Sequence, residues 1–272
     1  MLPDQGFQNP LALLPLVMKD PLQRFTTRVD NYIKYRPGYP SEIIDLLRSE
    51  CLLSEESVIA DIGSGTGILS ELFLNNGNRV IGIEPNAAMR GAAEQMLKSY
   101  GKFTSREGSA ESTKIAPTSV NFVTAGQSFH WFDPTKARWE FTRILKPQGW
   151  VVLIWNERRL NSTPFLRAYE ELLMRFGTDY AQLRQKNATE LIQDFFAPEP
   201  FKLRTLENTQ EFDFDGLRGR VLSSSYIPEV GAPNFEAMLV HLRKIFETHA
   251  KQGRVAIEYD TQVFFGRLPA VD

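Results

Sequence analysis

The sequence contains little cysteine and little histidine: one cysteine, Cys51, and three histidines among 272 residues. A single cysteine cannot form an internal disulfide, which is typical of proteins from a reducing compartment, so we expect a cytoplasmic protein. His130, His241 and His249 show no metal-ligand spacing with the cysteine. No metal site is therefore expected.

Dense blocks of charge and long apolar runs are also missing. The formal net charge is -2 and no Lys/Arg cluster stands out, which argues against nucleic-acid and membrane partners. An apolar stretch at residues 11–18 contains Pro15 and is too short to span a bilayer. We interpret residues 1–40 as an N-terminal arm or lid and residues 41–272 as one domain, acting as a monomer or homodimer.

Strand-like and helix-like patterns alternate from Val58 onwards, which is typical of a parallel sheet with helices on both faces. The predicted fold class is α/β, with a doubly wound, mostly parallel seven-stranded sheet and helical cap elements within about 157–200 and 215–250. A turn is expected at KPQGW (146–150). Strands are expected at 58–62, 79–84, 103–107, 120–126, 151–155, 201–214 and 255–268, and helices from 68 to the NNGN turn at 75–78, at 87–97, 134–145, 163–196 and 234–250.

The stretch VIADIGSGTGILS (58–70) places a glycine-rich turn between a predicted strand and a predicted helix. Its glycines are Gly63, Gly65 and Gly67, and Ile68 stands where the dinucleotide fingerprint requires its third glycine. Glycines lack a Cβ atom, so the backbone can touch a ligand directly. Because the loop contains no basic residue, we expect a ligand without a phosphate group.

Other side chains follow the ends of the first two predicted strands, where open parallel sheets bind ligands. Asp61 can hold a cation such as an amino group, and Glu84 can accept hydrogen bonds from both hydroxyls of a ribose. Pro85 and Met89 can flank a flat base. A ligand with an ammonium group, a ribose diol and a base, but no phosphate, is S-adenosylmethionine.

Several motifs, taken in order along the chain, resemble those of class I S-adenosylmethionine-dependent methyltransferases. The resemblance covers about residues 25–157 and implies a Rossmann-like methyltransferase fold. The motifs are YIKYRPGYP (32–40), DIGSGTG (61–67), IEPNAAM (83–89), GSAEST (108–113), AGQSFHWFD (125–133) and RILKPQGWVVLIWN (143–156). Of these, YIKYRPGYP and AGQSFHWFD look like the small-molecule branch, similar to trans-aconitate and quinone-pathway methyltransferases.

The resemblance implies S-adenosylmethionine as the cofactor and assigns its methionyl end to the glycine loop and the N-terminal arm. Asp61 would meet the amino group, and Arg36 would pair with the carboxylate. Gln127 would lie near the sulfonium. The remaining residues implied at this end are Tyr32, Gly63, Ser64, Gly65 and Gly67.

The same resemblance assigns the adenosyl end to the next two strand ends. Glu84 would take the ribose hydroxyls, Pro85 and Met89 would pack on the adenine, and Ala110 and Glu111 would approach the adenine edge. Ser109 departs from the pattern, because many relatives have an acid there. A serine accepts a hydrogen bond from the adenine amino group more weakly.

The expected function is methyl transfer from S-adenosylmethionine to a small organic acceptor, on a carboxylate or hydroxyl oxygen. The protein contributes mainly positioning and a dry pocket to such a displacement, so a base is optional. His130 is a candidate catalytic base or a part of the pocket wall. Trp131, Trp155 and Asn156 are candidate substrate-pocket residues, although the tryptophans could instead fill the core. The alternatives are a non-catalytic S-adenosylmethionine-binding protein and a nicotinamide-dependent reductase.

Overall fold

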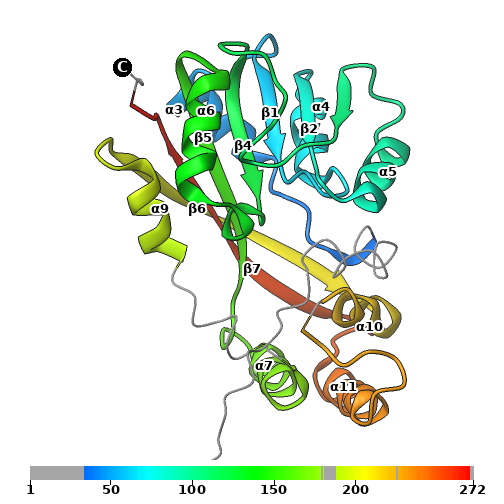
Figure 1. Ribbon diagram of the computed structural model, residues 1–272. Helices are drawn as coiled ribbons and strands as arrows, with labels where there is room; N and C mark the ends of the chain where they lie inside the picture. Colours follow the sequence, from blue (N-terminus) through cyan, green and yellow to red (C-terminus); the bar gives the residue numbers. More distant parts are fainter. Residues whose placement is uncertain (1–33, 179, 181–187, 225, 270–272) are drawn as a thin grey trace, which may run out of the picture.

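The fold is built around one seven-stranded sheet (Figure 1). The computed structural model describes residues 34–178, 180, 188–224 and 226–269. The strand order is β3-β2-β1-β4-β5-β7-β6, which confirms the predicted seven-stranded α/β sheet. The strands are β1 (Val58–Ile62), β2 (Arg79–Ile83), β3 (Phe103–Arg106), β4 (Val120–Gly126), β5 (Leu145–Arg158), β6 (Phe201–Phe212) and β7 (Val255–Gly266).

Strand direction divides the sheet into a parallel part and an antiparallel edge. β1 pairs in parallel with β2 on one side and β4 on the other, and β3 and β5 continue the parallel part outward. β7 runs antiparallel between β5 and β6. Because the chain leaves β1 toward β2 and later returns on the β4 side, the order reverses beside β1, and the carboxyl ends there form the expected ligand crevice.

Helices cover both faces of the sheet, because strands such as β5 carry apolar side chains on both faces. Val151 and Leu153 belong to the apolar cluster under α6 and α9, whereas Val152 and Ile154 belong to the cluster under α3 and α4. A strand buried on both faces reads as a continuous apolar run.

No helix of the described residues is long and apolar enough to cross a membrane. The helices are α3 (Glu42–Cys51), α4 (Ile68–Asn75), α5 (Ala87–Met96), α6 (Pro134–Ile144), α7 (Pro164–Phe176), α9 (Ala188–Phe196), α10 (Phe214–Leu222) and α11 (Phe235–His249), with a 3₁₀ turn, η1 (Phe129–Trp131).

A separate apolar cluster lies at the far end of the long β6–β7 pair (Figure 1). There α7, α10 and α11 pack together and against strand residues such as Phe212 and Ile257. The predicted helical stretch over 163–196 is interrupted after Phe176, where α7 ends. A side chain on Gly177 would lie 2.5 Å from the Leu173 carbonyl, so a glycine is suited to this helix end.

The predicted turn at 146–150 is a bulge within a longer strand. β5 begins at Leu145, which pairs with Val120, and Trp150 then pairs with Phe122. The intervening residues loop out, and Gln148 there has a φ of 63°. The strand also continues past Trp155 to Arg158, because those residues pair with β7. The predicted strand 151–155 is thus only the buried middle of β5.

We expect Gly67→Ala to lower the free energy of unfolding by about 1–3 kcal/mol. Gly67 has a φ of 87°, and a Cβ atom there would lie 2.6 Å from Leu97 Cδ1. The matched control is Gly91→Ala in α5, where a Cβ atom would meet nothing within 4 Å. That control should be neutral or stabilising in urea denaturation. Equal stabilities for the two variants would contradict the packing described here.

Candidate active site

The loop between β1 and α4 turns sharply because its three glycines have left-handed backbone conformations. Gly63, Gly65 and Gly67 have φ values of 65°, 56° and 87°, which glycine adopts without strain. The N–H groups of Gly63 and Ser64 donate to the Ile83 carbonyl at 2.8 and 3.1 Å. The loop therefore folds across the end of β2 and presents its backbone to the crevice.

Two cavities open beside this glycine loop and share part of their walls. Cavity A encloses about 50 Å³ and is lined by Arg36, Pro37, Tyr39, Asp61, Gly63, Ser64, Gly65, Thr66, Ile68, Leu69, Gly126, Gln127 and Asn156. Cavity B encloses about 210 Å³ and is lined by Gly63, Gly65, Glu84, Pro85, Asn86, Met89, Ser109, Ala110, Glu111, Gly126, Gln127, Ser128, Trp131 and Phe132. The shared residues are Gly63, Gly65, Gly126 and Gln127, so the two cavities meet between the glycine loop and the end of β4.

Asp61 is a buried carboxylate in the wall of cavity A. Its two oxygens accept hydrogen bonds from Ser70 Oγ at 2.7 Å and from Thr124 Oγ1 at 3.3 Å. Burial raises the pKa of Asp61 to about 6, and the negative charge of Glu84 adds to this, although both hydroxyl donors oppose it. A cation bound in cavity A would offset the cost of ionising Asp61.

Glu84 is the buried acid of cavity B, and the backbone fixes its orientation. Oε2 accepts from the N–H of Gly65 at 3.0 Å, and Oε1 accepts from the N–H of Asn86 at 2.8 Å. Burial raises the pKa of Glu84 above its usual value, and these two backbone donors counteract part of the shift. Each oxygen keeps acceptor capacity, so the carboxylate can still take hydroxyl donors from a ligand.

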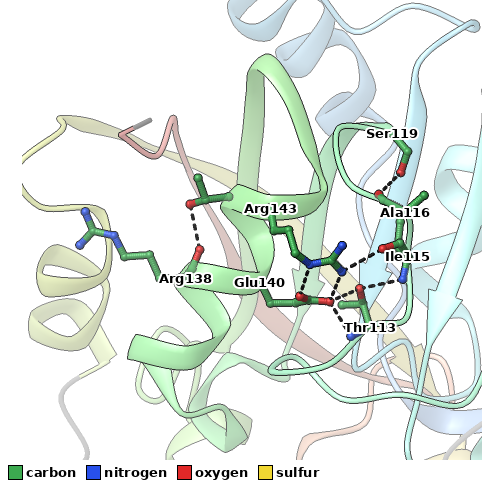
Figure 2. Close-up of polar contacts among 8 residues, drawn as sticks. Thr113, Ile115, Ala116, Ser119, Arg138, Glu140 and Arg143 are labelled. Carbon is green, nitrogen blue, oxygen red and sulfur yellow. Dashed lines mark hydrogen bonds and ion pairs between the residues drawn. The ribbon is translucent and has the colours of Figure 1, made fainter. Parts of the chain in front are cut away.

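The loop after β3 supplies Ser109, Ala110 and Glu111 to cavity B and is pinned from α6 (Figure 2). Thr113 donates to Glu140 through its N–H at 2.8 Å. Arg143 pairs with the same carboxylate and donates to the Ile115 carbonyl at 2.8 Å. Glu111 in turn accepts from the N–H of Asp133 at 2.9 Å. These contacts hold the wall of cavity B against α6, at its start through Asp133 and near its end through Glu140 and Arg143.

Residues 35–39, here called the strap, close one side of cavity A. Arg36, Pro37 and Tyr39 line the cavity. The Gly38 carbonyl accepts from Asn156 Nδ2 at 3.1 Å, and the Asn156 carbonyl accepts from Gln127 Nε2 at 3.2 Å. Asn156 thus links the strap to Gln127, one of the four residues that line both cavities.

Sequence analysis assigned no individual role to several lining residues, of which Thr66 is the most informative. Thr66 is 1% exposed, and its hydroxyl has no hydrogen-bond partner among the described residues. A buried hydroxyl without a partner is costly unless a ligand satisfies it. In the sequence, the position of Thr66 between Gly65 and Gly67 already indicated that it belongs to the glycine loop. Pro37, Asn86, Ser128 and Phe132 likewise had no assigned role, because the approach of each side chain to the cavities depends on the fold.

Not every predicted site residue reaches a cavity. Trp131 lines cavity B, but Trp155 packs edge-on against core phenylalanines and lines neither cavity. His130 is exposed, also outside both linings. Gly67 is buried under Leu97 of the turn that ends α5. Tyr32 lies outside the described residues.

The chain is similar in sequence and in fold to known methyltransferases. A family model described as a methyltransferase domain matches residues 60–153, from β1 into β5. An uncharacterised methyltransferase of Schizosaccharomyces pombe is 29% identical over 225 residues, which cover 82% of this chain and 87% of that protein. An uncharacterised methyltransferase of Mycobacterium tuberculosis is 29% identical over 245 residues, covering 87% and 92%.

Solved structures agree on the fold. A proposed type II methyltransferase from Anaeromyxobacter dehalogenans superimposes with a TM-score of 0.65 at 20% identity, over 86% of this chain and 99% of that one. These matches support a class I S-adenosylmethionine-dependent methyltransferase. The methyltransferase therefore takes its methyl group from S-adenosylmethionine, as the motifs implied.

The raised pKa of Asp61 makes the stability of the methyltransferase depend on pH. The folded state holds a proton on Asp61 up to about pH 6, whereas a freely exposed aspartate loses it near 3.8. The folded state therefore binds more protons in this window, and its stability falls as the pH rises through it. Relative to Asp61→Asn, we expect the wild type to lose about 2–3 kcal/mol of unfolding free energy between pH 4 and pH 7.

Urea denaturation of both proteins across this pH range measures the difference. Thr135→Ala, which replaces an exposed residue in the first turn of α6, is a matched control and should follow the wild type. Parallel pH profiles for the wild type and Asp61→Asn would show that Asp61 ionises as freely as an exposed aspartate.

Proposed function

We propose that the methyltransferase transfers the methyl group to an oxygen atom of a small organic acceptor, with the donor spread across cavities A and B. The observation that carries the proposal is the junction of the two cavities at Gly63, Gly65, Gly126 and Gln127. A donor that occupies both cavities places its sulfonium near this junction. The acceptor then needs to reach only this one point.

The donor-binding residues fit the two ends of S-adenosylmethionine. In cavity B, Glu84 would accept from the ribose hydroxyls, and Pro85 and Met89 would flank the adenine. In cavity A, Asp61 would hold the amino group, and Arg36 and the Thr66 hydroxyl would meet the carboxylate. The unpartnered Thr66 hydroxyl supports this assignment because the donor carboxylate would satisfy it.

The chain contributes position and exclusion of water rather than a strong base. S-adenosylmethionine supplies an electrophilic methyl group, whose bond to sulfur breaks as the bond to the acceptor oxygen forms. The described carboxylates of the linings are already engaged: Asp61 with two hydroxyls, Glu84 with two backbone N–H groups and Glu111 with one. Holding both partners in line is the main source of rate for such a displacement.

This arrangement favours a carboxylate as the acceptor over a hydroxyl. A carboxylate is ionised at neutral pH, so no proton has to leave when its oxygen attacks. An alcohol would need a base to remove its proton, and His130 lies outside both linings. The electron pair of the breaking bond returns to sulfur, and the products are a neutral methyl ester and S-adenosylhomocysteine.

The acceptor class can be tested with donor labelled in the methyl group. The purified protein is incubated with small carboxylic acids, phenols, alcohols and amines. We expect the label to enter the carboxylic acids. Alkaline hydrolysis of the product should release the label as methanol, because the product is a methyl ester. Label confined to amines would contradict the proposal, and donor binding without label in any acceptor would favour a non-catalytic binding protein.

We expect Glu84→Ala to weaken S-adenosylmethionine binding by at least about tenfold, because a charged hydrogen-bond acceptor is lost. Isothermal titration calorimetry measures the dissociation constant. Glu107→Ala is a matched control, since Glu107 is an exposed acid that pairs with Arg90 at 3.6 Å outside both linings. An unchanged constant for Glu84→Ala would remove this acid from the donor site.

We expect His130→Ala to leave the turnover number unchanged within about twofold, because the exposed imidazole lines neither cavity. Steady-state rates at saturating donor, with the best acceptor of the panel, measure this. A loss of tenfold or more would restore His130 as a catalytic base.

A further inference from the structure

Arg220 is a buried cation whose described contacts include no carboxylate. It lies on α10 and is 6% exposed. Its guanidinium donates to three hydroxyls: Tyr259 at 3.2 Å, Ser223 at 3.4 Å and Ser224 at 3.2 Å. Burying a charge is expensive, and the partners of Arg220 among the described residues are neutral hydroxyls, so a role beyond packing is expected of it.

One chain of hydrogen bonds runs from Arg220 to the strap. A guanidinium can only donate, so the Tyr259 oxygen accepts from Arg220 and its proton points onward. Tyr259 donates to Gln210 Oε1 at 3.0 Å, and Gln210 Nε2 donates to the Tyr35 carbonyl at 3.3 Å. The arginine thereby sets the direction of every bond and orients the Gln210 amide with its NH₂ group toward the strap.

A second contact path reaches the next strap residue. Ser223 accepts from Arg220 and returns its own proton to the Arg220 carbonyl at 2.7 Å. The Ser223 carbonyl accepts from Arg36 Nη2 at 3.0 Å. The same arginine therefore organises the groups that hold both Tyr35 and Arg36.

Packing places the strap directly against α10. A side chain on Gly219 would overlap the Tyr35 ring, so the ring lies on the glycine that precedes Arg220. Two further residues of the strap, Pro37 and Tyr39, line cavity A. A shift of the strap away from α10 would therefore change the wall of cavity A.

We propose that Arg220, Tyr259 and Gln210 form a positioning relay that holds the strap in place, so that Arg36 and Tyr39 close cavity A around the methionyl end of the donor. The relay rests on the proposed placement of that end in cavity A. None of the three lines cavity A or cavity B. Elements late in the chain, α10, β6 and β7, thereby influence the affinity of a site whose lining residues all precede residue 157.

Two variants interrupt the relay with little change of shape. Tyr259→Phe removes only the central hydroxyl, and Gln210→Met removes both amide contacts at a half-buried position. Tyr180→Phe is the matched control. The Tyr180 hydroxyl, also in the α7–α10–α11 cluster, bonds to Arg158 at 2.7 Å and Glu170 at 2.6 Å and does not contact the strap.

Calorimetry with S-adenosylmethionine should show a dissociation constant raised about three- to tenfold in each relay variant, the effect of losing one hydrogen bond that positions the site. The double variant should be no weaker than the single ones, because both interrupt one chain. Tyr180→Phe should bind as the wild type does, although its melting temperature falls as that of Tyr259→Phe does. Hydrogen exchange in a peptide spanning the strap should quicken only in the relay variants.

Wild-type affinity in both relay variants would overturn the relay and leave the proposed function standing. Equal weakening in Tyr180→Phe would also overturn it, since the effect would then reflect general loosening of the cluster. A wild-type protein that binds no S-adenosylmethionine would overturn the proposed donor site, and the relay with it.

Discussion

The backbone of the glycine loop, folded across the end of β2, is the constraint on which the rest of the site depends. The bonds from Gly63 and Ser64 to Ile83 join the ends of two parallel strands. They bring the Gly65 N–H to the Glu84 carboxylate. The acid that follows β2 and the loop after β1 therefore act as one unit, and both cavities are built from it. No other residue type adopts all three backbone conformations of this loop without strain.

The two buried acids differ in what surrounds them, and this suits them to different ligand groups. Asp61 faces hydroxyl donors and is costly to ionise, with a pKa raised to about 6. Glu84 is held by backbone N–H groups that favour its charged form. A cationic group in cavity A would lower the cost of ionising Asp61, whereas hydroxyl groups in cavity B would need only an oriented acceptor. Donor binding in the proposed position would thus relieve an electrostatic cost that folding leaves in place.

The strap shows how the antiparallel edge serves the parallel core. Asn208 and Gln210 are alternate residues of β6, and both donate to strap carbonyls. In a strand, alternate side chains share a face, so one face of the edge strand binds the strap. Asn156 of β5 adds a third donor at Gly38. The edge of the sheet that is farthest in order from β1 therefore holds one wall of cavity A.

The sequence by itself determined the alternation of strands and helices, the glycine loop and the acids Asp61 and Glu84, because periodicity and residue chemistry are local properties. The family resemblance placed Gln127 near the sulfonium, and the structure puts Gln127 in the walls of both cavities. Only the tertiary structure decided that His130 turns outward, that Trp155 belongs to the core and that β5 carries a bulge. The relay from Arg220 to Tyr35 was likewise beyond the sequence. Its members are separated by up to 224 positions (259 minus 35) and meet only because β6 and β7 pair beneath α10.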